Sequence, residues 1–523
     1  FSKPGLRALH LKVGTPSLSG AGWDDLRPLD ILSEVVPTSG LARGMRVFQV
    51  QGVRGFQLAA SRPRALGFPA SRLFIHCDRF PEEFSIIVTL RVLSVPAKRN
   101  EYVFTLMAEE SPSVLVGLRY VTLGSRPPCT KQEKAQFWFN ASRRGLYLCN
   151  GSAWISMLEV KQRLDYLEEY QNLVTNSETM GVEVFTIPKV GLFAATANRY
   201  TPPGSAIYKW TDGKFVPYQN IPTYQAQSWK YFTIGKKIFL AVANFEQNDR
   251  GQEFSVIYKW SRRKEKFITY QRITTHSARD WEAFVIEGEA FLAVVNHREG
   301  NNHNIDSVIY RWNPRTGLFE TNQTIPTSGA YDWEFFTIGP YSFLAVANTF
   351  NGTSTKIYSH IYIWLSGSFQ LFQSILTFGA ADWEVFSIGD RVFLAVANSH
   401  SYDSGMPAPS NFYAINSSIY ELNITAQMFV KFQDLLTYSA LDWEFFSVGD
   451  DSFLVVANSF DGFTFSVNSI IYRWQGYEGF VAAHHLPTVG CRDWEAFHTV
   501  EGSYLLYSSA KEPLSKVLKL KTT

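Results

Sequence analysis

The chain has 523 residues, of which 46% are apolar and 15% aromatic, so it can bury a large core and intrinsic disorder is excluded. Its 49 Lys and Arg residues nearly balance its 47 Asp and Glu residues, and a net charge of +2 gives no long-range field to hold nucleic acid or an anionic membrane. No apolar stretch reaches the roughly 18 residues of a membrane span, because the best candidate, SIIVTLRVLSV, contains Arg91. The sequence begins at Phe1, so we expect any secretory leader to have been removed or to lie outside it.

Residues 1–122 contain several strand-like runs. Three of them are RVFQVQGVRGFQLAA, FPEEFSIIVTLRV and EYVFTLMAEE, and together they resemble the thrombospondin-type laminin G domain. The resemblance implies a β-sandwich. Because SVLVGLRY leads directly into VTLGSRPPC, we expect this sandwich to be partial, with an incomplete second sheet. A group of basic residues could contact a glycosaminoglycan, but we favour the interpretation that it is a solvated basic face. The group consists of Arg62, Arg64 and Arg72.

Residues 123–162 contain a predicted disulfide hairpin that links the two halves. Cys129 and Cys149 flank TKQEKAQFWFNASRRGLYL, which has the pattern of two strands around a turn, and a disulfide would close it. The other two cysteines, Cys77 and Cys491, could pair with each other, lie buried as small hydrophobic residues, or bridge to another chain.

Six N-x-Ser/Thr sequons favour a secreted or cell-surface glycoprotein over an intracellular protein. The four cysteines show no metal-type spacing, which agrees with an extracellular setting. The predicted glycosylation sites are Asn140, Asn150, Asn322, Asn351, Asn416 and Asn423.

Residues 163–523 are built from an internal repeat of about 50 residues, marked by the motif D-W-E-x-F. The weakest copy, GVEVF, keeps Glu183 and Phe185 at the Glu and Phe positions, and it brings the number of units to seven. The tryptophans of the other units are expected to pack between neighbouring units; they are Trp229, Trp281, Trp333, Trp383, Trp443 and Trp494.

Each unit contains four short runs with strand character. The first, D-W-E-x-F, alternates between two faces, whereas FLAVAN lacks polar alternation, as expected of a strand buried on both faces. The runs S-x-I-Y-x-W and F-x-x-Y-Q-x-I-P-T follow. Four-stranded sheets with two apolar faces can cover them by packing on one another around an axis, so the pattern predicts a seven-bladed β-propeller.

The two ends of the repeat region predict how the propeller closes. The glutamine of the fourth run first occurs at Gln171, one strand before the first D-W-E copy, and the chain stops after a third run, SKVLKL. We therefore expect the segment YLEEYQNLV to pair with the final strand and complete the last blade, which removes an exposed sheet edge.

The runs SARDWEAFVIEGEAFLAVVN and SALDWEFFSVGDDSFLVVAN, with SIIYRW, resemble the EAR (EPTP) repeat family, which includes the leucine-rich glioma-inactivated proteins. The resemblance covers residues 163–523. It implies a propeller that engages cell-surface receptors and holds calcium in its central channel. Together with the laminin G-like half, it implies a link to Notch signalling and to epithelial and inner-ear development.

If the first strand lines the axis, the D-W-E face gathers acidic side chains in the channel. Two like charges about 7 Å apart repel by roughly 2.4 kcal/mol at an effective dielectric near 20, so the cluster needs compensation, and Lys230 alone opposes it. We favour a structural role, in which each Asp caps the preceding turn and each Glu, including Glu183, bonds to a neighbouring blade. The alternative is a channel Ca²⁺, for which the candidate ligands are Asp280, Glu282, Asp332, Glu334, Asp382, Glu384, Asp442, Glu444, Asp493 and Glu495.

The connection between the second and third runs varies most among the units, as in HREGNNHNID and SHSYDSGMPAPSNFYAINS. Variable loops on a rigid scaffold usually carry recognition, so the sequence favours a non-catalytic scaffold that binds an extracellular or cell-surface protein. The alternative is a carbohydrate-binding or carbohydrate-cleaving propeller that uses channel carboxylates. Near-identical copies argue against catalysis, because a catalytic acid and base need different environments, and the repeats show no arginine cluster suited to a carboxylate clamp.

Overall fold

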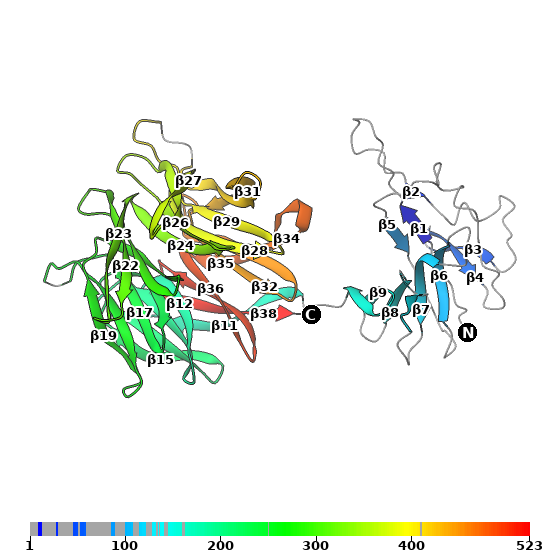
Figure 1. The fold of residues 1–523 in the computed structure, drawn as a ribbon, viewed down its shortest axis with the longest axis horizontal. Coiled ribbons are helices and arrows are strands. Elements are labelled where there is room, and N and C mark those ends of the chain that lie inside the picture. The colour runs from blue at the N-terminus through cyan, green and yellow to red at the C-terminus, as the bar shows by residue number, and fades with distance from the viewer. Residues whose placement is uncertain are drawn as a thin grey trace. The chain divides into compact units, whose positions relative to one another are not determined.

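The computed structural model forms two compact units, Phe1–Val160 and Lys161–Thr523 (Figure 1). Arg62, Arg64, Arg72 and Cys77 lie outside the described residues. The structure describes the backbone of residues 9–12, 28–29, 45–50, 53–58, 85–88, 100–107 and 114–121, and then residues 128–131, 134, 136–140, 145–158, 163–248, 250–407 and 411–522.

The first unit contains three sheets in its described residues. Their strand orders are β2-β1-β5, β3-β4 and β10-β9-β8-β7-β6, and β7 and β8 run parallel. Cys129 and Cys149 form a disulfide beside a small core of Trp138, Tyr147 and Trp154. The strands are β1 (Leu9–Lys12), β2 (Pro28–Leu29), β3 (Met45–Val50), β4 (Val53–Leu58), β5 (Ser85–Val88), β6 (Asn100–Met107), β7 (Val114–Val121), β8 (Gln136–Asn140), β9 (Gly145–Cys149) and β10 (Trp154–Leu158).

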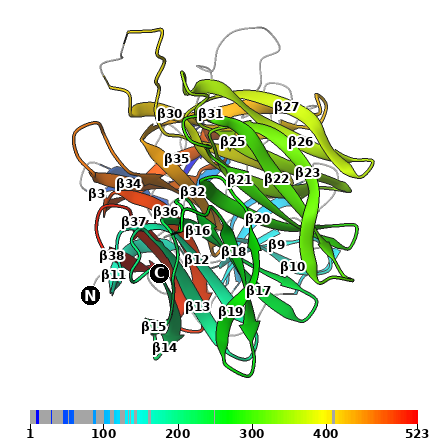
Figure 2. The same ribbon diagram turned by 90° about the vertical axis from the view of Figure 1, so that its left-hand side faces the viewer.

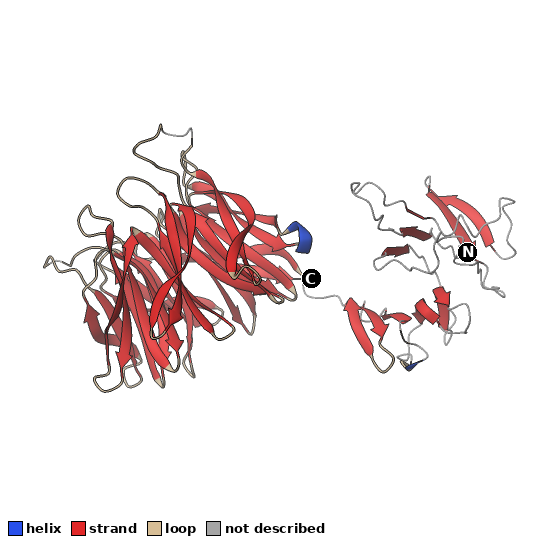
Figure 3. Cartoon of the chain, turned by 45° about the horizontal axis from the view of Figure 1, so that its top comes forward, coloured by secondary structure: helices blue, strands red, loops and turns tan. Residues whose placement is uncertain are grey.

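The described residues of the second unit form seven four-stranded antiparallel sheets, which confirms the predicted all-β class (Figure 3). We number them in chain order, sheet 1 beginning with β12. The first strands are β12 (Thr179–Ile187), β16 (Ala226–Ile234), β20 (Ala278–Ile286), β24 (Ala330–Ile338), β28 (Ala380–Ile388), β32 (Ala440–Val448) and β36 (Cys491–Thr499). The second strands are β13 (Gly191–Asn198), β17 (Lys237–Asn244), β21 (Glu289–Asn296), β25 (Tyr341–Asn348), β29 (Arg391–Asn398), β33 (Asp451–Asn458) and β37 (Gly502–Ser509).

The outer half of each sheet consists of a third and a fourth strand. The third strands are β14 (Ser205–Thr211), β18 (Ser255–Ser261), β22 (Asn304–Asn313), β26 (Lys356–Leu365), β30 (Ala414–Asn423), β34 (Ser466–Trp474) and β38 (Leu514–Thr522). The fourth strands are β15 (Lys214–Ile221), β19 (Lys266–Ile273), β23 (Leu318–Ser328), β27 (Ser368–Phe378), β31 (Met428–Tyr438), β35 (Phe480–Val489) and, for sheet 7, β11 (Leu164–Val174). A short 3-10 turn, η4 (Gly476–Glu478), precedes β35.

The apolar second strands form the centre of the second unit. Along β21, the residues from Phe291 to Asn296 are all buried, because this strand is covered on both faces by neighbouring sheets. The first strands contact one another in sequence from β12 to β36, and β36 contacts β12 again. Figure 2 accordingly shows β12, β16, β32 and β36 near the middle of this unit, with β15, β19, β23 and β27 toward its outside.

The last sheet is assembled from both ends of the second unit, as the sequence predicts. Strand β11 pairs antiparallel with β38, with Leu167 opposite Leu520. Lys516 Nζ lies 2.9 Å from a carboxylate oxygen of Glu169, and Lys521 Nζ lies 2.6 Å from one of Glu168. The edge of β38 is therefore paired rather than exposed to another chain.

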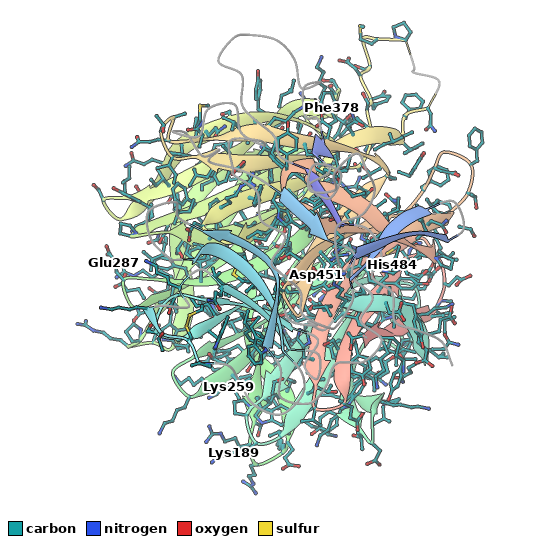
Figure 4. The ribbon with its side chains drawn as sticks, turned by 90° about the vertical axis from the view of Figure 1, so that its right-hand side faces the viewer. Lys189, Lys259, Glu287, Phe378, Asp451 and His484 are labelled. Atoms are coloured by element: carbon teal, nitrogen blue, oxygen red, sulfur yellow. A yellow bond between two sulfur atoms is a disulfide. The ribbon has the colours of Figure 1, made fainter. Side chains whose placement is uncertain are left out.

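A glutamine side chain joins most of the fourth strands to the next sheet. The Nε2 group of Gln323 donates to the carbonyl of Phe369 (2.8 Å), and its Oε1 accepts the N–H of the same residue (2.9 Å). His484, labelled in Figure 4, takes the glutamine position on β35. Equivalent pairs are Gln171 with Phe215, Gln219 with Phe267, Gln271 with Phe319, Gln373 with Phe429 and Gln433 with Phe480.

Candidate functional site

The acidic side chains of the D-W-E motifs are bonded to the first strand of the next sheet. Each aspartate accepts the backbone N–H at the tryptophan position of that strand, for example Asp382 from Trp443 at 2.9 Å. The sequence predicts turn caps for these aspartates, and this role is different, because the stagger between sheets brings the next first strand within reach. The other pairs are Asp280 with Trp333, Asp332 with Trp383, Asp442 with Trp494 and Asp493 with Val182.

The glutamates repeat this arrangement two residues further along the strand. Glu384 Oε1 accepts the N–H of Phe445 at 3.0 Å. Glu282 instead pairs with Lys230, whose Nζ lies 2.7 Å from its Oε2. Burial raises the pKa of Glu183, and a side-chain hydrogen bond with Glu495 opposes this rise. The remaining pairs are Glu183 with Tyr231, Glu334 with Val385 and Glu444 with Ala496.

Burial and mutual repulsion raise the pKa values of these carboxylates despite their hydrogen bonds. Burial raises the pKa of Glu444 to about 8, and it raises the pKa values of Asp280 and Asp493 to about 7. Burial lowers the pKa of Lys230, but Glu282 and the other acids near it raise that pKa well above its usual value. Burial, followed by neighbouring carboxylates, also raises the pKa well above its usual value for Asp332, Glu334, Asp382, Glu384, Asp442 and Glu495.

The motif tryptophans point away from the acidic face and into the contacts between sheets. Trp383 is 1% exposed, and its indole Nε1 donates to the carbonyl of Val346 on β25 of the preceding sheet (3.0 Å). Trp333 is equally buried, but its Nε1 has no hydrogen-bond partner. The same indole bond joins Trp229 to Thr196, Trp281 to Val242, Trp443 to Val396 and Trp494 to Val456.

A cavity of about 110 Å³ lies among the aspartates, and we call it the ring cavity. Two arginines that the sequence did not single out also line it. Arg279 and Arg492 directly precede Asp280 and Asp493, and both donate to Oε1 of Gln227 at 3.0 Å. The sequence-based interpretation that Lys230 is the one cation opposing the acids is therefore wrong. The expectation that the repeats hold no arginine cluster is wrong for the same reason. The sequence could have revealed these arginines if the residue before each motif aspartate had been compared across the copies. The cavity is lined by Met180, Gln227, Ser228, Arg279, Asp280, Tyr331, Asp332, Ala381, Asp382, Leu441, Asp442, Arg492 and Asp493.

The oxygen-rich lining has the donor chemistry that Ca²⁺ prefers, but it is not arranged as a metal site. In the part of the chain that the structure describes, no three Asp, Glu, His or Cys side chains are grouped so that they could hold a metal ion. The aspartates are bonded to backbone N–H groups, and Arg279 and Arg492 line the same cavity. A calcium ion would have to draw several carboxylates away from these bonds, and it stays a prediction.

Calcium binding predicts a measurable change in thermal stability. If the channel holds Ca²⁺, a chelator is expected to lower the melting temperature and added Ca²⁺ to restore it, because an ion that binds the folded state stabilises it. Asp382→Asn should weaken this response. Identical melting curves with chelator and with excess Ca²⁺ would exclude the ion.

The predicted glycosylation sites lie on strands and loops of both units. Asn150, Asn322, Asn416 and Asn423 are exposed, whereas Asn351 is half-buried. The Oδ1 of Asn351 accepts N–H groups of Thr353 and Ser354, and no described bond engages its Nδ2. Asn140 ends β8, and its side chain is not described.

The remaining cysteine of the second unit is a buried thiol. Cys491 is fully buried at the start of β36 and forms no disulfide with any described cysteine. Among the described residues, no helix is sufficiently long and apolar to cross a lipid bilayer.

Comparison with known proteins agrees with the repeat seen in both sequence and structure. The EPTP domain model matches residues 214–261, 266–313, 318–365, 368–423 and 428–475. The mouse thrombospondin-type laminin G domain and EAR repeat-containing protein is 56% identical over 665 aligned positions, which cover 99% of this chain and 99% of the relative. This chain belongs to that family. The human thrombospondin-type laminin G domain and EAR repeat-containing protein is also 56% identical and covers 98% of both chains. The mouse leucine-rich repeat LGI family member 3 is 29% identical over 147 residues, or 28% of this chain and 25% of the relative.

The EPTP matches are staggered by one strand relative to the sheets. Each begins near the start of a fourth strand, as at Lys214 on β15, and ends near the end of the third strand of the next sheet, as at Ser261 on β18. Each EPTP unit in this family member therefore spans a boundary between sheets, which is also where the glutamine pairs lie. This offset explains why the last sheet needs a strand from the other end of the repeat region.

Proposed function

We propose that the second unit is a seven-bladed β-propeller that acts as a non-catalytic scaffold and binds an extracellular or cell-surface protein. Seven sheets whose first strands contact one another in a ring support the propeller. The family relationship supports a scaffold role, and the disulfide and the sequons support secretion. The proposal includes the link to Notch signalling and to epithelial and inner-ear development that the family resemblance implies.

The observation that carries the proposal is the loop between β29 and β30, residues 399–413. It is bonded to the corresponding loops of both neighbouring sheets. The N–H of Thr355 donates to Tyr402 O at 2.8 Å, and Asn411 Nδ2 donates to Asp461 O at 3.0 Å. Two large apolar side chains nevertheless stay exposed in this loop, Tyr402 at 42% and Met406 at 67%. A loop that is anchored but presents apolar side chains is suited to a partner surface.

The asparagine that ends six of the seven second strands places this loop on the same face as the turn between sheets. In sheet 4, Asn348 Oδ1 accepts the N–H of Ser328 in that turn, and its Nδ2 donates to Tyr358 O on the third strand. The neighbouring loop of sheet 6 adds Phe463, which is 89% exposed. The variable loops and their exposed apolar side chains therefore share one end of the sheets.

Exchange of the 399–413 loop tests the proposal. Replacing it with the shorter loop 459–465 is expected to abolish saturable binding of the fluorescently labelled full chain to epithelial cells. The melting temperature should change little, because the flanking strands β29 and β30 are retained. Ile424→Ser, in an exposed turn between β30 and β31, is the matched control and should bind normally. Undiminished binding by the loop-exchanged protein would rule out this face.

The alternative function is a propeller that binds or cleaves carbohydrate with its central carboxylates. One observation favours it: Glu282 is paired with Lys230, whereas Glu334 has a raised pKa, so two neighbouring copies differ in their electrostatics. Under this alternative, Glu282→Gln or Glu334→Gln should abolish turnover of a glycan while cell binding persists.

A further inference from the structure

The acidic lining of the ring cavity is missing from two neighbouring sheets. Sheets 3 to 7 each contribute a motif aspartate, but sheet 1 has Gly181 and sheet 2 has Ser228 at that position. A Cβ at Gly181 would lie 2.6 Å from the backbone oxygen of Gln227, so close packing excludes an acid there. In this sector of the cavity, sheets 1 and 2 therefore contribute no carboxylate of their own, although Asp493 bonds to Val182 on sheet 1 and Asp280 to Ser228 on sheet 2.

Two arginines reach this sector from the sheets on either side of it. Arg279 extends from β20 of sheet 3 and Arg492 from β36 of sheet 7, and their guanidinium groups share Oε1 of Gln227 on β16. Gln227 is buried, with 6% of its surface exposed. Three side chains from three sheets thus converge on one oxygen atom, and one neutral acceptor serves two cations.

Aromatic rings hold Arg279 in place and leave one of its donors unused. Its guanidinium carbon lies 3.9 Å from the ring centre of Tyr331 and 4.5 Å from that of Phe245. Its Nε is shielded from solvent and has no hydrogen-bond partner. In the described residues, neither Arg279 nor Arg492 has a carboxylate oxygen within 4.0 Å. A buried charged donor without a partner is energetically unfavourable.

The electrostatics of this sector favour an anion. The pKa of Arg279 is lowered to about 10, chiefly by burial; Tyr331 opposes this shift, whereas Arg492 and Arg298 add to it. Burial also lowers the pKa of Arg492; Tyr331 and Asp493 oppose this shift, whereas Arg199 adds to it. The cavity of about 110 Å³ compares with about 30 Å³ per water molecule in the liquid. It has room for a carboxylate group.

We propose that the protein partner inserts an aspartate or glutamate side chain here, and that its carboxylate pairs with Arg279 and Arg492 in place of Gln227. Planar guanidinium groups bind carboxylates in two-pronged geometry, and the free Nε of Arg279 supplies one of the required donors. This inference rests on the proposed function, and it names the chemistry that the scaffold recognises at the centre of its loop face. The competing explanation is that the two arginines are counter-ions for the aspartates beneath them.

Titration of the full chain with two peptides tests the clamp. The probes are acetyl-Gly-Glu-Gly-amide and acetyl-Gly-Gln-Gly-amide, which differ in the charge of one side chain. We expect the Glu peptide to bind about tenfold more tightly, because hydrogen bonds to an ionised acceptor are roughly twice as strong as neutral ones. Arg279→Met and Arg492→Met should abolish this preference, whereas Arg315→Met, at an exposed turn, should retain it. Equal binding of the two peptides to the wild-type chain, which needs no variant, would overturn the proposal.

Melting temperatures separate the clamp from the counter-ion explanation. If the arginines await a ligand, Arg279→Met should leave the melting temperature at pH 7 unchanged or higher, because it removes repulsion with Arg492. A lower melting temperature, with a steeper loss of stability above pH 7, would show that Arg279 neutralises the aspartates, and the proposal would fail. If both arginine variants still bind epithelial cells while the loop-exchanged protein does not, the clamp is wrong and the scaffold function stands.

Discussion

Trp383→Ala is expected to destabilise the second unit by about 3–5 kcal/mol, the usual cost of removing a large aromatic side chain from a core. Trp383 is 1% exposed and packs with Phe336 and Tyr420 in the contact between sheets 4 and 5. Its loss leaves a cavity and also removes the indole bond to Val346. Denaturant unfolding followed by fluorescence measures the change in free energy.

The neighbouring copy provides an internal control for the indole bond. Trp333→Phe keeps an aromatic ring and removes an N–H group that has no partner, whereas Trp383→Phe leaves the carbonyl of Val346 without its donor. We expect the second substitution to cost about 1–2 kcal/mol more than the first, the range for an unsatisfied buried group. Equal losses would show that the bond between sheets contributes nothing to stability.

The second unit is expected to lose stability as the pH rises from about 5 to about 8. The central carboxylates have raised pKa values in the folded state, so between their ordinary values and the folded values the folded chain binds more protons than the unfolded chain. The carboxylates therefore make stability fall with increasing pH in this window, whereas His297, whose pKa burial lowers well below its usual value, opposes the trend at the acidic end. A series of melting temperatures across this range gives the slope.

Glu444→Gln should flatten that slope and stabilise the protein at pH 8. The amide oxygen of Gln can still accept the N–H of Ala496, but it carries no charge, and we expect a gain of about 1–2 kcal/mol. Glu287→Gln, at an exposed turn labelled in Figure 4, is the control and should leave the slope unchanged. A slope that Glu444→Gln does not alter would mean that this carboxylate stays ionised in the folded state.

Local patterns made the strands of the repeat predictable. The side chains of D-W-E alternate between two faces, whereas FLAVAN shows no polar alternation. Because every copy has the same physical environment, a strand misassigned in one copy can be corrected by comparison with the others. The pairing of β11 with β38 could be predicted because a strand was missing at one end and surplus at the other. The glutamine at the fourth-strand position was visible in the sequence, but its bonds to the next sheet were not.

The arrangement of the acidic face depended on contacts between copies, which a repeat pattern does not reveal. Whether Asp382 caps a turn or bonds to Trp443 depends on the stagger of adjacent sheets. Arg279 and Arg492 lie far apart in sequence, and their meeting at Gln227 follows from their equivalent positions on two sheets that flank sheets 1 and 2. Comparing the residue directly before each motif aspartate across the copies would have shown both arginines.

The bond between the two ends of the second unit has a consequence for biosynthesis. Strand β11 emerges from the ribosome first among the strands of this unit, yet its partner β38 is translated last. Six sheets can form while the chain is still growing, whereas the seventh must wait for residues 514–522. A chain that ends before residue 514 would thus leave β11 unpaired, and we expect such a product to be retained and degraded rather than exported.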